Sequence, residues 1–349
     1  MRNRTRTRLL HAVAVVGTTA FLGYAFLQQV DRSDVSNNVA QRSRASVAPS
    51  TQHPAPAAAP PVVDAVSLRK PNKKYLGVAM DGVPWSMADL KTFAKSVGKS
   101  PNLIGYFQQY GDPLDASNLE KIYAEGALPL IQVEPHKYPM AKIVSGATDD
   151  YLATLARDAR RLNMPFVLSL GHEMNGDWYP WGTKGSTAAQ FVAAWKRMHG
   201  AFAKAGATNV IFMWNPNIVN PRPAVDLAKL YPGDRYVDWV GVTGYYNAAL
   251  GDRRIFATLF QPTLTKVRTF TDRPIFIAET GAAPSADKPK QMQDLFDSVE
   301  SRPDVVGFLW FNYNKPGRNE RNWKFDSDAQ SKARFSELAR RPTFGFPVR

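Results

Sequence analysis

The sequence contains no cysteine and only five histidines among 349 residues. Without cysteine, the protein forms neither disulfide bonds nor thiolate sites. The histidines, at positions 11, 53, 136, 172 and 199, lack a paired spacing such as HExxH, so we expect no metal site. The glycine-rich phosphate loops GxGxxG and GxxxxGK[ST] are also missing. We therefore expect chemistry that needs no cofactor.

Acidic residues are scarce in the first part of the chain. The formal net charge is +14, and residues 1–74 contribute +8 of it from eleven Lys and Arg against three Asp. The other +6 is spread over the remaining residues, which makes them mildly basic without a concentrated basic stripe. We therefore expect no nucleic-acid partner.

The first 30 residues have the pattern of an export segment. Four arginines precede a mostly apolar run from Leu9 to Leu27, which is about long enough to cross a bilayer. No clear A-x-A cleavage site follows. We expect a signal anchor or a signal peptide, with the arginines in the cytoplasm and the rest outside. Membrane contact would occur only through this anchor.

Residues 31–72 are rich in Pro, Ala and Ser, and this composition predicts a disordered linker. The remainder, 73–349, is predicted to form one domain in which short apolar runs alternate with amphipathic segments. The predicted strands are 75–80, 102–107, 128–133, 165–170, 209–214, 237–244, 274–279 and 305–310. The predicted helices are 87–97, 117–125, 150–162, 187–205, 255–271, 288–301 and 329–339, with a short helix at best around 225–230.

Eight strands alternating with helices over this length predict a (β/α)8 TIM barrel of the α/β class. A doubly wound open sheet is the alternative, although it normally carries a glycine-rich phosphate loop. In a barrel, the active site lies at the carboxyl ends of the strands. Unusual polar residues follow the predicted strands at those ends, among them Glu134, Asn215 and Glu279.

Glu173 and Glu279 each follow an unbroken apolar strand, where a charge is costly unless it is solvated, paired or used. On the fourth and seventh strands of a barrel they would face each other across the mouth. Glycoside hydrolysis needs such a pair of carboxyl groups. The alternative is that each glutamate forms an ion pair at the rim.

The segment GHEMNGDWYPWG at 171–182 holds His, Glu, Asn, Asp, Tyr and two Trp within twelve residues. Packing alone does not require this set, whereas a sugar site uses hydrogen bonds and flat aromatic faces. Met174 and Gly176 have ordinary structural interpretations as a core residue and a turn. Trp181 fits the wall of a cleft and the core equally well.

This segment, together with IAETG at 277–281, resembles glycoside hydrolase family 26, over roughly residues 75–340. The resemblance implies a retaining mechanism in which Glu173 is the general acid/base and Glu279 is the nucleophile. It also implies a set of residues around the substrate and the nucleophile: His172, Asn175, Trp178, Tyr245, Trp310, His136, Glu134 and Trp323.

Several roles within that set follow from the resemblance. His172 would orient the surroundings of the nucleophile, and Trp178 would stack on sugar. Tyr245 would hydrogen-bond the nucleophile, with Tyr246 as the alternative because strand register decides which tyrosine points inward. Trp310 would floor the subsite of the reacting sugar, and Trp323 would line the cleft.

The implied activity is that of an endo-β-glycanase acting on β-mannan, glucomannan or β-1,3-1,4-glucan. Mannanases of the family commonly have Arg-Pro before His-Glu, where this chain has Leu170-Gly171. Because of this difference, the sequence does not decide between mannose and glucose as the sugar of the substrate. A hydrolase that processes the cell's own exopolysaccharide and a non-catalytic polysaccharide-binding barrel are alternatives. We expect a monomer, outside the cytoplasm.

Overall fold

The computed structural model describes residues 65–219, 224–247, 255–315 and 321–349. The predicted export segment, residues 1–30, and the linker up to residue 64 lie outside these ranges. Among the helices that the structure does describe, none combines the length and the apolar character needed to cross a membrane.

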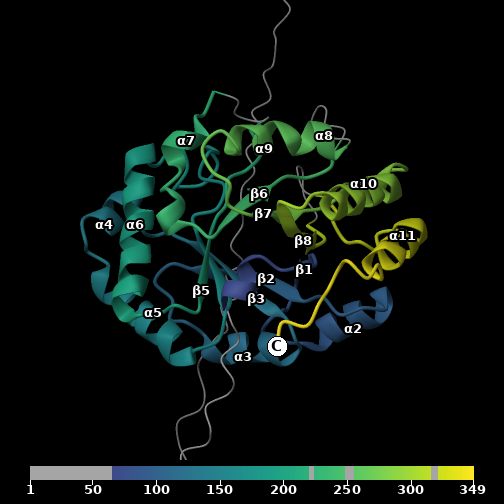
Figure 1. Ribbon diagram of the computed structural model, residues 1–349, viewed down its shortest axis with the longest axis horizontal. Coiled ribbons are helices and arrows are strands. Elements are labelled where there is room, and N and C mark those ends of the chain that lie inside the picture. Colours follow the sequence, from purple (N-terminus) through teal and green to yellow (C-terminus); the bar gives the residue numbers. More distant parts are fainter. Residues whose placement is uncertain (1–64, 220–223, 248–254, 316–320) are drawn as a thin grey trace, which may run out of the picture.

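Eight parallel strands close into one barrel in the order β1 to β8, with helices around it (Figure 1). The strands are β1 (Tyr75–Met80), β2 (Leu103–Gln109), β3 (Leu128–Glu134), β4 (Phe166–Leu170), β5 (Val210–Trp214), β6 (Trp239–Thr243), β7 (Ile275–Thr280) and β8 (Val305–Asn312). The predicted (β/α)8 barrel is therefore confirmed. The closing contact between β1 and β8 excludes the open sheet.

The helices of the ring are close to their predicted ranges. They are α2 (Ala88–Val97), α3 (Ala116–Ala124), α5 (Asp149–Leu162), α6 (Ala188–Ala205), α7 (Leu227–Leu230), α8 (Phe256–Leu259), α9 (Gln261–Val267), α10 (Lys288–Ser301) and α11 (Ala329–Ala339). The predicted helix 255–271 is divided into α8 and α9, with Pro262 in the first turn of α9. The short α4 (Met140–Val144) and the 3-10 turn Asp234–Tyr236 were not predicted.

Alternation along each strand divides the buried side chains into two layers. The inner core fills the barrel and includes Leu130, Met213 and Phe276. The outer core lies between the strands and the helices and includes Ile131, Trp214 and Ile277. Seven strands are buried along their whole length and β2 along its first four residues. Their sequences are therefore almost continuously apolar, and a polar residue that points inward stands out.

The predicted linker ends too late in the chain. Residues 65–69 form the short helix α1, in which Leu68 is buried. The carbonyl of Arg69 accepts a hydrogen bond of 2.8 Å from Trp239 Nε1. The guanidinium of Arg69 pairs with Asp238 at 3.2 Å. α1 therefore packs at the start of β6. A five-residue helix beside a Pro- and Ala-rich stretch leaves no periodic pattern that the sequence could show.

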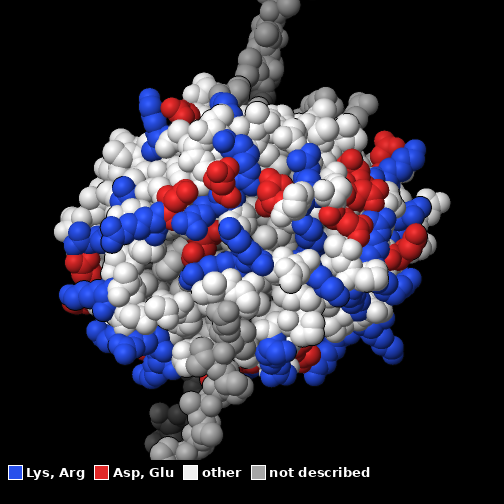
Figure 2. All heavy atoms as spheres, viewed as in Figure 1, with Lys and Arg blue, Asp and Glu red and all other residues white. Residues whose placement is uncertain are grey.

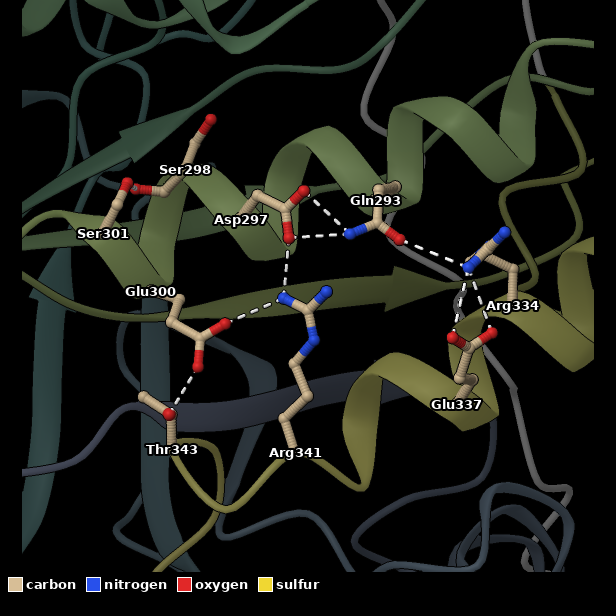
Figure 3. Close-up of polar contacts among 9 residues, drawn as sticks. All are labelled: Gln293, Asp297, Ser298, Glu300, Ser301, Arg334, Glu337, Arg341 and Thr343. Atoms are coloured by element: carbon tan, nitrogen blue, oxygen red, sulfur yellow. Dashed lines mark hydrogen bonds and ion pairs between the residues drawn. The ribbon is translucent and has the colours of Figure 1, made fainter.

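Ion pairs join α10 to the chain that follows α11, and a hydrogen bond of 3.4 Å from Arg334 to Gln293 joins α11 to α10 (Figure 3). Arg341 contacts Asp297 at 2.7 Å and Glu300 at 2.8 Å, while Arg334 contacts Glu337 at 3.0 Å within α11. Pairs exposed in this way contribute about 0–1 kcal/mol each. They help to hold the C-terminal part of the chain on α10. Buried aromatic contacts of Phe335 in α11 with Phe296 and Phe325 lie beneath them.

The charges on the surface are mixed. On the face drawn in Figure 2, Lys and Arg side chains lie among Asp and Glu. This distribution agrees with a mildly basic domain, and the absence of a nucleic-acid partner stays a prediction.

Candidate active site

The two glutamates lie at the same end of the barrel and are almost buried. Glu173 follows β4 and is 7% exposed, and Glu279 lies in β7 and is 8% exposed. The register of β7 shifts against both neighbouring strands close to Glu279. Such irregularities near a site redirect a side chain. The carboxyl ends of β4 and β7 thus form the centre of the site.

Glu173 has an unusual backbone. Its φ is +55°, in the left-handed region, and Gly171 two residues earlier has φ +57°. A non-glycine residue there costs of order 1 kcal/mol and persists where surrounding contacts hold it. One such contact is the 2.7 Å hydrogen bond from the Glu173 N–H to the carbonyl of Asn215.

Two donors orient the Glu173 carboxylate. Trp178 Nε1 donates to Oε2 at 2.7 Å, and Asn217 Nδ2 donates to Oε1 at 2.6 Å. Asn175, predicted to bind substrate, instead pairs both of its amide atoms with the backbone of Asn217 at 2.8 Å and is nearly buried. Asn175 is therefore a positioning residue for Asn217, and its contact with substrate stays a prediction.

Glu279 is held by donors from β3 and from the residues that follow β6. The Tyr245 hydroxyl donates to Oε1, and Gln132 Nε2 lies 3.4 Å from Oε2. Tyr246 points outward, where it is buried and donates to Asp294 at 3.0 Å. The structure therefore selects Tyr245 of the two adjacent tyrosines as the partner of Glu279.

A buried polar layer supports this carboxylate from inside the barrel. Asn215 Nδ2 donates to Gln132 Oε1 at 2.8 Å, and the Thr243 hydroxyl lies 3.3 Å from Asn215 Oδ1. Because Gln132 accepts with its oxygen, its nitrogen is directed to Glu279. A buried network in which each member is paired fixes the side chains that it contains.

The electrostatics of the pair are strongly coupled. Burial and, second to it, the charge of Glu173 together raise the pKa of Glu279 to about 8, although the Tyr245 hydrogen bond opposes the shift. Two buried carboxylates repel each other, so near neutral pH one proton is shared between them. Burial, assisted by the nearby carboxylates, raises the pKa of Tyr245 well above its ordinary value. Tyr245 therefore stays a donor.

Trp323 lines the site beside Tyr245. Their rings lie 4.5 Å apart at 42°, and a β-carbon at Gly281 would lie 3.3 Å from the Trp323 ring. The glycine therefore lets the indole approach β7. Trp323 is held at its backbone, since its N–H donates to Tyr313 and its carbonyl accepts from Trp310 Nε1 at 2.9 Å.

Trp310 does not lie in the cleft. Its exposed fraction is 0%, and its ring packs on Phe335 of α11 in the outer core. The predicted role as the floor of a subsite is therefore wrong. The neighbour Phe311 points inward, 5.9 Å from Tyr245. Alternation assigns adjacent residues to opposite faces, so an error of one residue in register reverses the assignment.

Lys288, at the start of α10, is fully buried and holds the chain around Trp323. Its ammonium group donates to the carbonyl of Lys324 at 2.7 Å, to that of Asn322 at 3.4 Å and to the Ser327 hydroxyl at 2.8 Å. Burial lowers the pKa of Lys288 to about 8. A buried cation needs such acceptors, and here they belong to the residues on both sides of Trp323.

The other predicted residues form a second cluster. Glu134 lies 3.6 Å from His136 Nε2 and 4.0 Å from His172 Nε2, and the latter contacts the Tyr179 hydroxyl at 3.2 Å. Burial lowers the pKa of His172 to about 4, so the imidazole is neutral at neutral pH. These contacts link His172 to Tyr179 and to Glu134, whose charge acts on Glu279. The orienting role of His172 stays a prediction. Trp181 is core, stacked on Tyr179 at 4.4 Å.

Sequence reasoning missed Gln132, Asn217 and Tyr179. Gln132 carried a signal, because it is the polar residue inside the apolar run LPLIQV. Asn217 lies two residues beyond Asn215 in a loop, where asparagine is common for reasons of turn geometry. Lys315 was also missed. It lies 4.9 Å above the Phe311 ring, and its charge lowers the pKa of Glu279.

A closed barrel with two coupled, hydrogen-bonded glutamates on β4 and β7 and aromatic rings beside them defines the class of barrel glycosidases. The family model for "Glycosyl hydrolase family 26" matches residues 138–297, which contain both glutamates. Over these residues the chain matches glycosyl hydrolase family 26, the family that its motifs resemble.

Two curated relatives show what this chain is similar to. Endoglucanase H of Acetivibrio thermocellus is 26% identical over 272 residues, which cover 73% of this chain and 29% of the relative. Mannan endo-1,4-beta-mannosidase A and B of Caldalkalibacillus mannanilyticus is 25% identical over 167 residues, 45% of this chain and 30% of the relative. The chain thus spans about 30% of the length of these relatives.

Solved structures share the fold at low identity. The catalytic domain of the Bacillus sp. JAMB-750 GH26 endo-beta-1,4-mannanase superimposes with a TM-score of 0.61 at 15% identity, covering 82% of this chain and 90% of that one. A GH26 beta-mannanase from Bacteroides ovatus gives 0.58 at 17%, covering 82% and 94%.

Proposed function

We propose that this protein is a retaining endo-β-glycanase that hydrolyses β-mannan, glucomannan or β-1,3-1,4-glucan by double displacement. The observation that carries the proposal is the arrangement of Glu173 and Glu279. Each is nearly buried, each accepts hydrogen bonds from two side chains, and the charge of one shifts the pKa of the other. The names of the two relatives support the choice of substrates.

In the first step, an ionised Glu279 oxygen attacks the anomeric carbon, and the bond from that carbon to the leaving oxygen breaks. Glu173 gives its proton to the leaving oxygen. In the second step, Glu173 takes a proton from water, whose oxygen attacks the same carbon and releases Glu279. The hydrogen bond from Tyr245 lowers the pKa of Glu279, and so favours placing the shared proton on Glu173.

The test is to incubate residues 65–349 with mannan, glucomannan, mixed-linkage glucan, xylan and cellulose, and to measure new reducing ends. The fragment for this test begins at Ala65 so that it includes α1, which packs on the barrel. We expect product from mannan or from a glucan, with the β-anomer formed first in NMR spectra. Polysaccharide binding without reducing ends would identify a non-catalytic barrel, and the α-anomer would contradict retention.

We also propose that the barrel lies outside the cytoplasm, attached through its N-terminal segment or released from it. The arginine cluster and the apolar run from Leu9 to Leu27 support this placement. Protease added to intact cells should then degrade the barrel. Protection until the cells are lysed would contradict the proposal.

A further inference from the structure

Trp85 is exposed, whereas Trp178 is half-buried and the other six tryptophans are buried. In the part of the chain that the structure describes, large hydrophobic side chains are exposed at Val66, Trp85 and Ile255, and Trp85, at 64%, is the aromatic one. By contrast, Trp195 and Trp239 are fully buried. A large exposed ring on a soluble protein marks a surface that contacts a ligand or partner more often than a small one does.

The turn that carries Trp85 is well anchored. Val83 and Pro84, directly before it, are buried. The Ser86 N–H donates to the carbonyl of Gly82 at 2.8 Å, and the edge of the indole meets the buried Tyr106 ring at 6.3 Å and 74°. The indole is thus held in place on one side and open to solvent on the other, so little conformational freedom is lost when a ligand contacts it.

The turn belongs to the same end of the barrel as the glutamates, because it follows the carboxyl end of β1. β1 pairs with β8, whose continuation carries Lys315. Partial burial of its carboxyl group raises the pKa of Asp81 in this turn, and the charge of Lys315 opposes that shift, as it does for Glu279. Lys315 therefore lies within electrostatic range of both Asp81 and Glu279, and connects the turn to the site.

We propose that Trp85 forms a separate sugar-binding subsite on the rim of the barrel, where its exposed face stacks on one residue of a neutral polysaccharide that extends beyond the glutamates. The inference rests on the proposed function. The surroundings favour a sugar over an apolar protein surface, because Asp81, Gly82 and Ser86 are exposed beside the indole. Sugar rings present an apolar face for the indole and hydroxyl groups for such polar neighbours.

The kinetic test compares Trp85→Ala and Trp85→Phe with the unchanged protein, on the polymer that it cleaves and on a short aryl glycoside. We expect Trp85→Ala to lower the ratio of kcat/KM on polymer to kcat/KM on the aryl glycoside about tenfold, through KM. Trp85→Phe should retain most of the ratio because it keeps a flat ring. An unchanged ratio in Trp85→Ala would overturn the subsite.

A binding test separates this inference from the proposed function. In the Glu279→Gln background, Trp85→Ala should reduce the retardation of the protein in gels that contain the polymer, whereas Val66→Ala, at the other end of the barrel, should not. If retardation depends on Trp85 but the unchanged protein does not hydrolyse the polymer, the proposed function would be contradicted and the subsite would be supported. Equal retardation of both Trp85 and Val66 variants would overturn the subsite alone.

Discussion

The surroundings of Glu173 and of Glu279 are built from different ranges of sequence. Glu173 receives its tryptophan donor from five residues away and its asparagine donor from the next βα loop. The donors to Glu279 come from β3 and from the end of β6, 147 and 34 residues away. Beyond Tyr245 lie Trp323 and then Lys288.

The difference teaches where each half is vulnerable. The Glu173 half is a compact loop with a strained residue, and its geometry depends on neighbours in sequence and on Asn215 and Asn217 of one adjacent loop. The Glu279 half is assembled from residues in or directly after β3, β5, β6 and β7, together with the loop around Trp323 that Lys288 holds. Substitutions far from the carboxylate can therefore disturb it. Equal effects on activity from matched variants in the two halves would contradict this comparison.

The largest effect is expected at the glutamates themselves. Glu279→Ala should lose about four powers of ten or more in kcat on every substrate, since no covalent intermediate can form. Glu173→Ala should lose much more on substrates with poor leaving groups than on activated aryl glycosides, which need no proton donor. The measurement is kcat across leaving groups of graded pKa. An equal loss at all leaving groups in Glu173→Ala would contradict an acid role.

Removing one donor from each carboxylate compares the halves directly. Hydrogen bonds to charged groups contribute about 1.5–3 kcal/mol, so Tyr245→Phe should lower kcat roughly 10- to 100-fold. The pKa of Glu279 should rise further, which moves the acidic limb of kcat/KM to higher pH. Trp178→Phe removes the donor to Glu173 and should leave that limb in place. If both variants shifted the same limb equally, the assignment of roles would be wrong.

Lys288→Met tests how far the Glu279 half extends. The variant keeps an unbranched side chain that is one atom shorter and leaves the carbonyls around Trp323 without their donor, and we expect kcat/KM to fall about fivefold. Lys290→Met, on an exposed position of the same helix, is the matched control. Thermal unfolding should accompany the kinetics. A loss of stability with unchanged kcat and KM would show that Lys288 supports the fold and not the site.

The smallest effect concerns stability against pH. Burial and the charge of Glu173 raise the pKa of Glu279 from its ordinary value of 4.5 to about 8, so the folded protein keeps one proton, shared between the two glutamates, that the unfolded chain releases. The contribution of this proton to the free energy of unfolding is complete below about pH 4.5 and is lost as pH rises through about 8. Glu279→Gln should therefore unfold about 2–4 °C higher than the unchanged protein at pH 8.5, with little difference at pH 4.5. Parallel curves of Tm against pH would contradict the shift.

The fold and the Glu173 half were predictable because their signals are local. Eight apolar runs at regular spacing require a sheet that is covered on both faces, and the polar, aromatic segment 171–182 contains the acid and its tryptophan donor together. The sequence also placed Glu279 at the end of its strand. These patterns span a few to about twenty residues and follow from burial and chain geometry alone.

Only the tertiary structure decided which side chains face the reaction. Closure of the barrel brings Gln132 of β3 to Glu279 of β7, and the register of single strands chooses Tyr245 over Tyr246 and Phe311 over Trp310. A strand presents alternate residues to opposite faces, so a shift of one residue exchanges cleft for core. The sequence determined the barrel and its two glutamates, and three-dimensional packing determined what holds them.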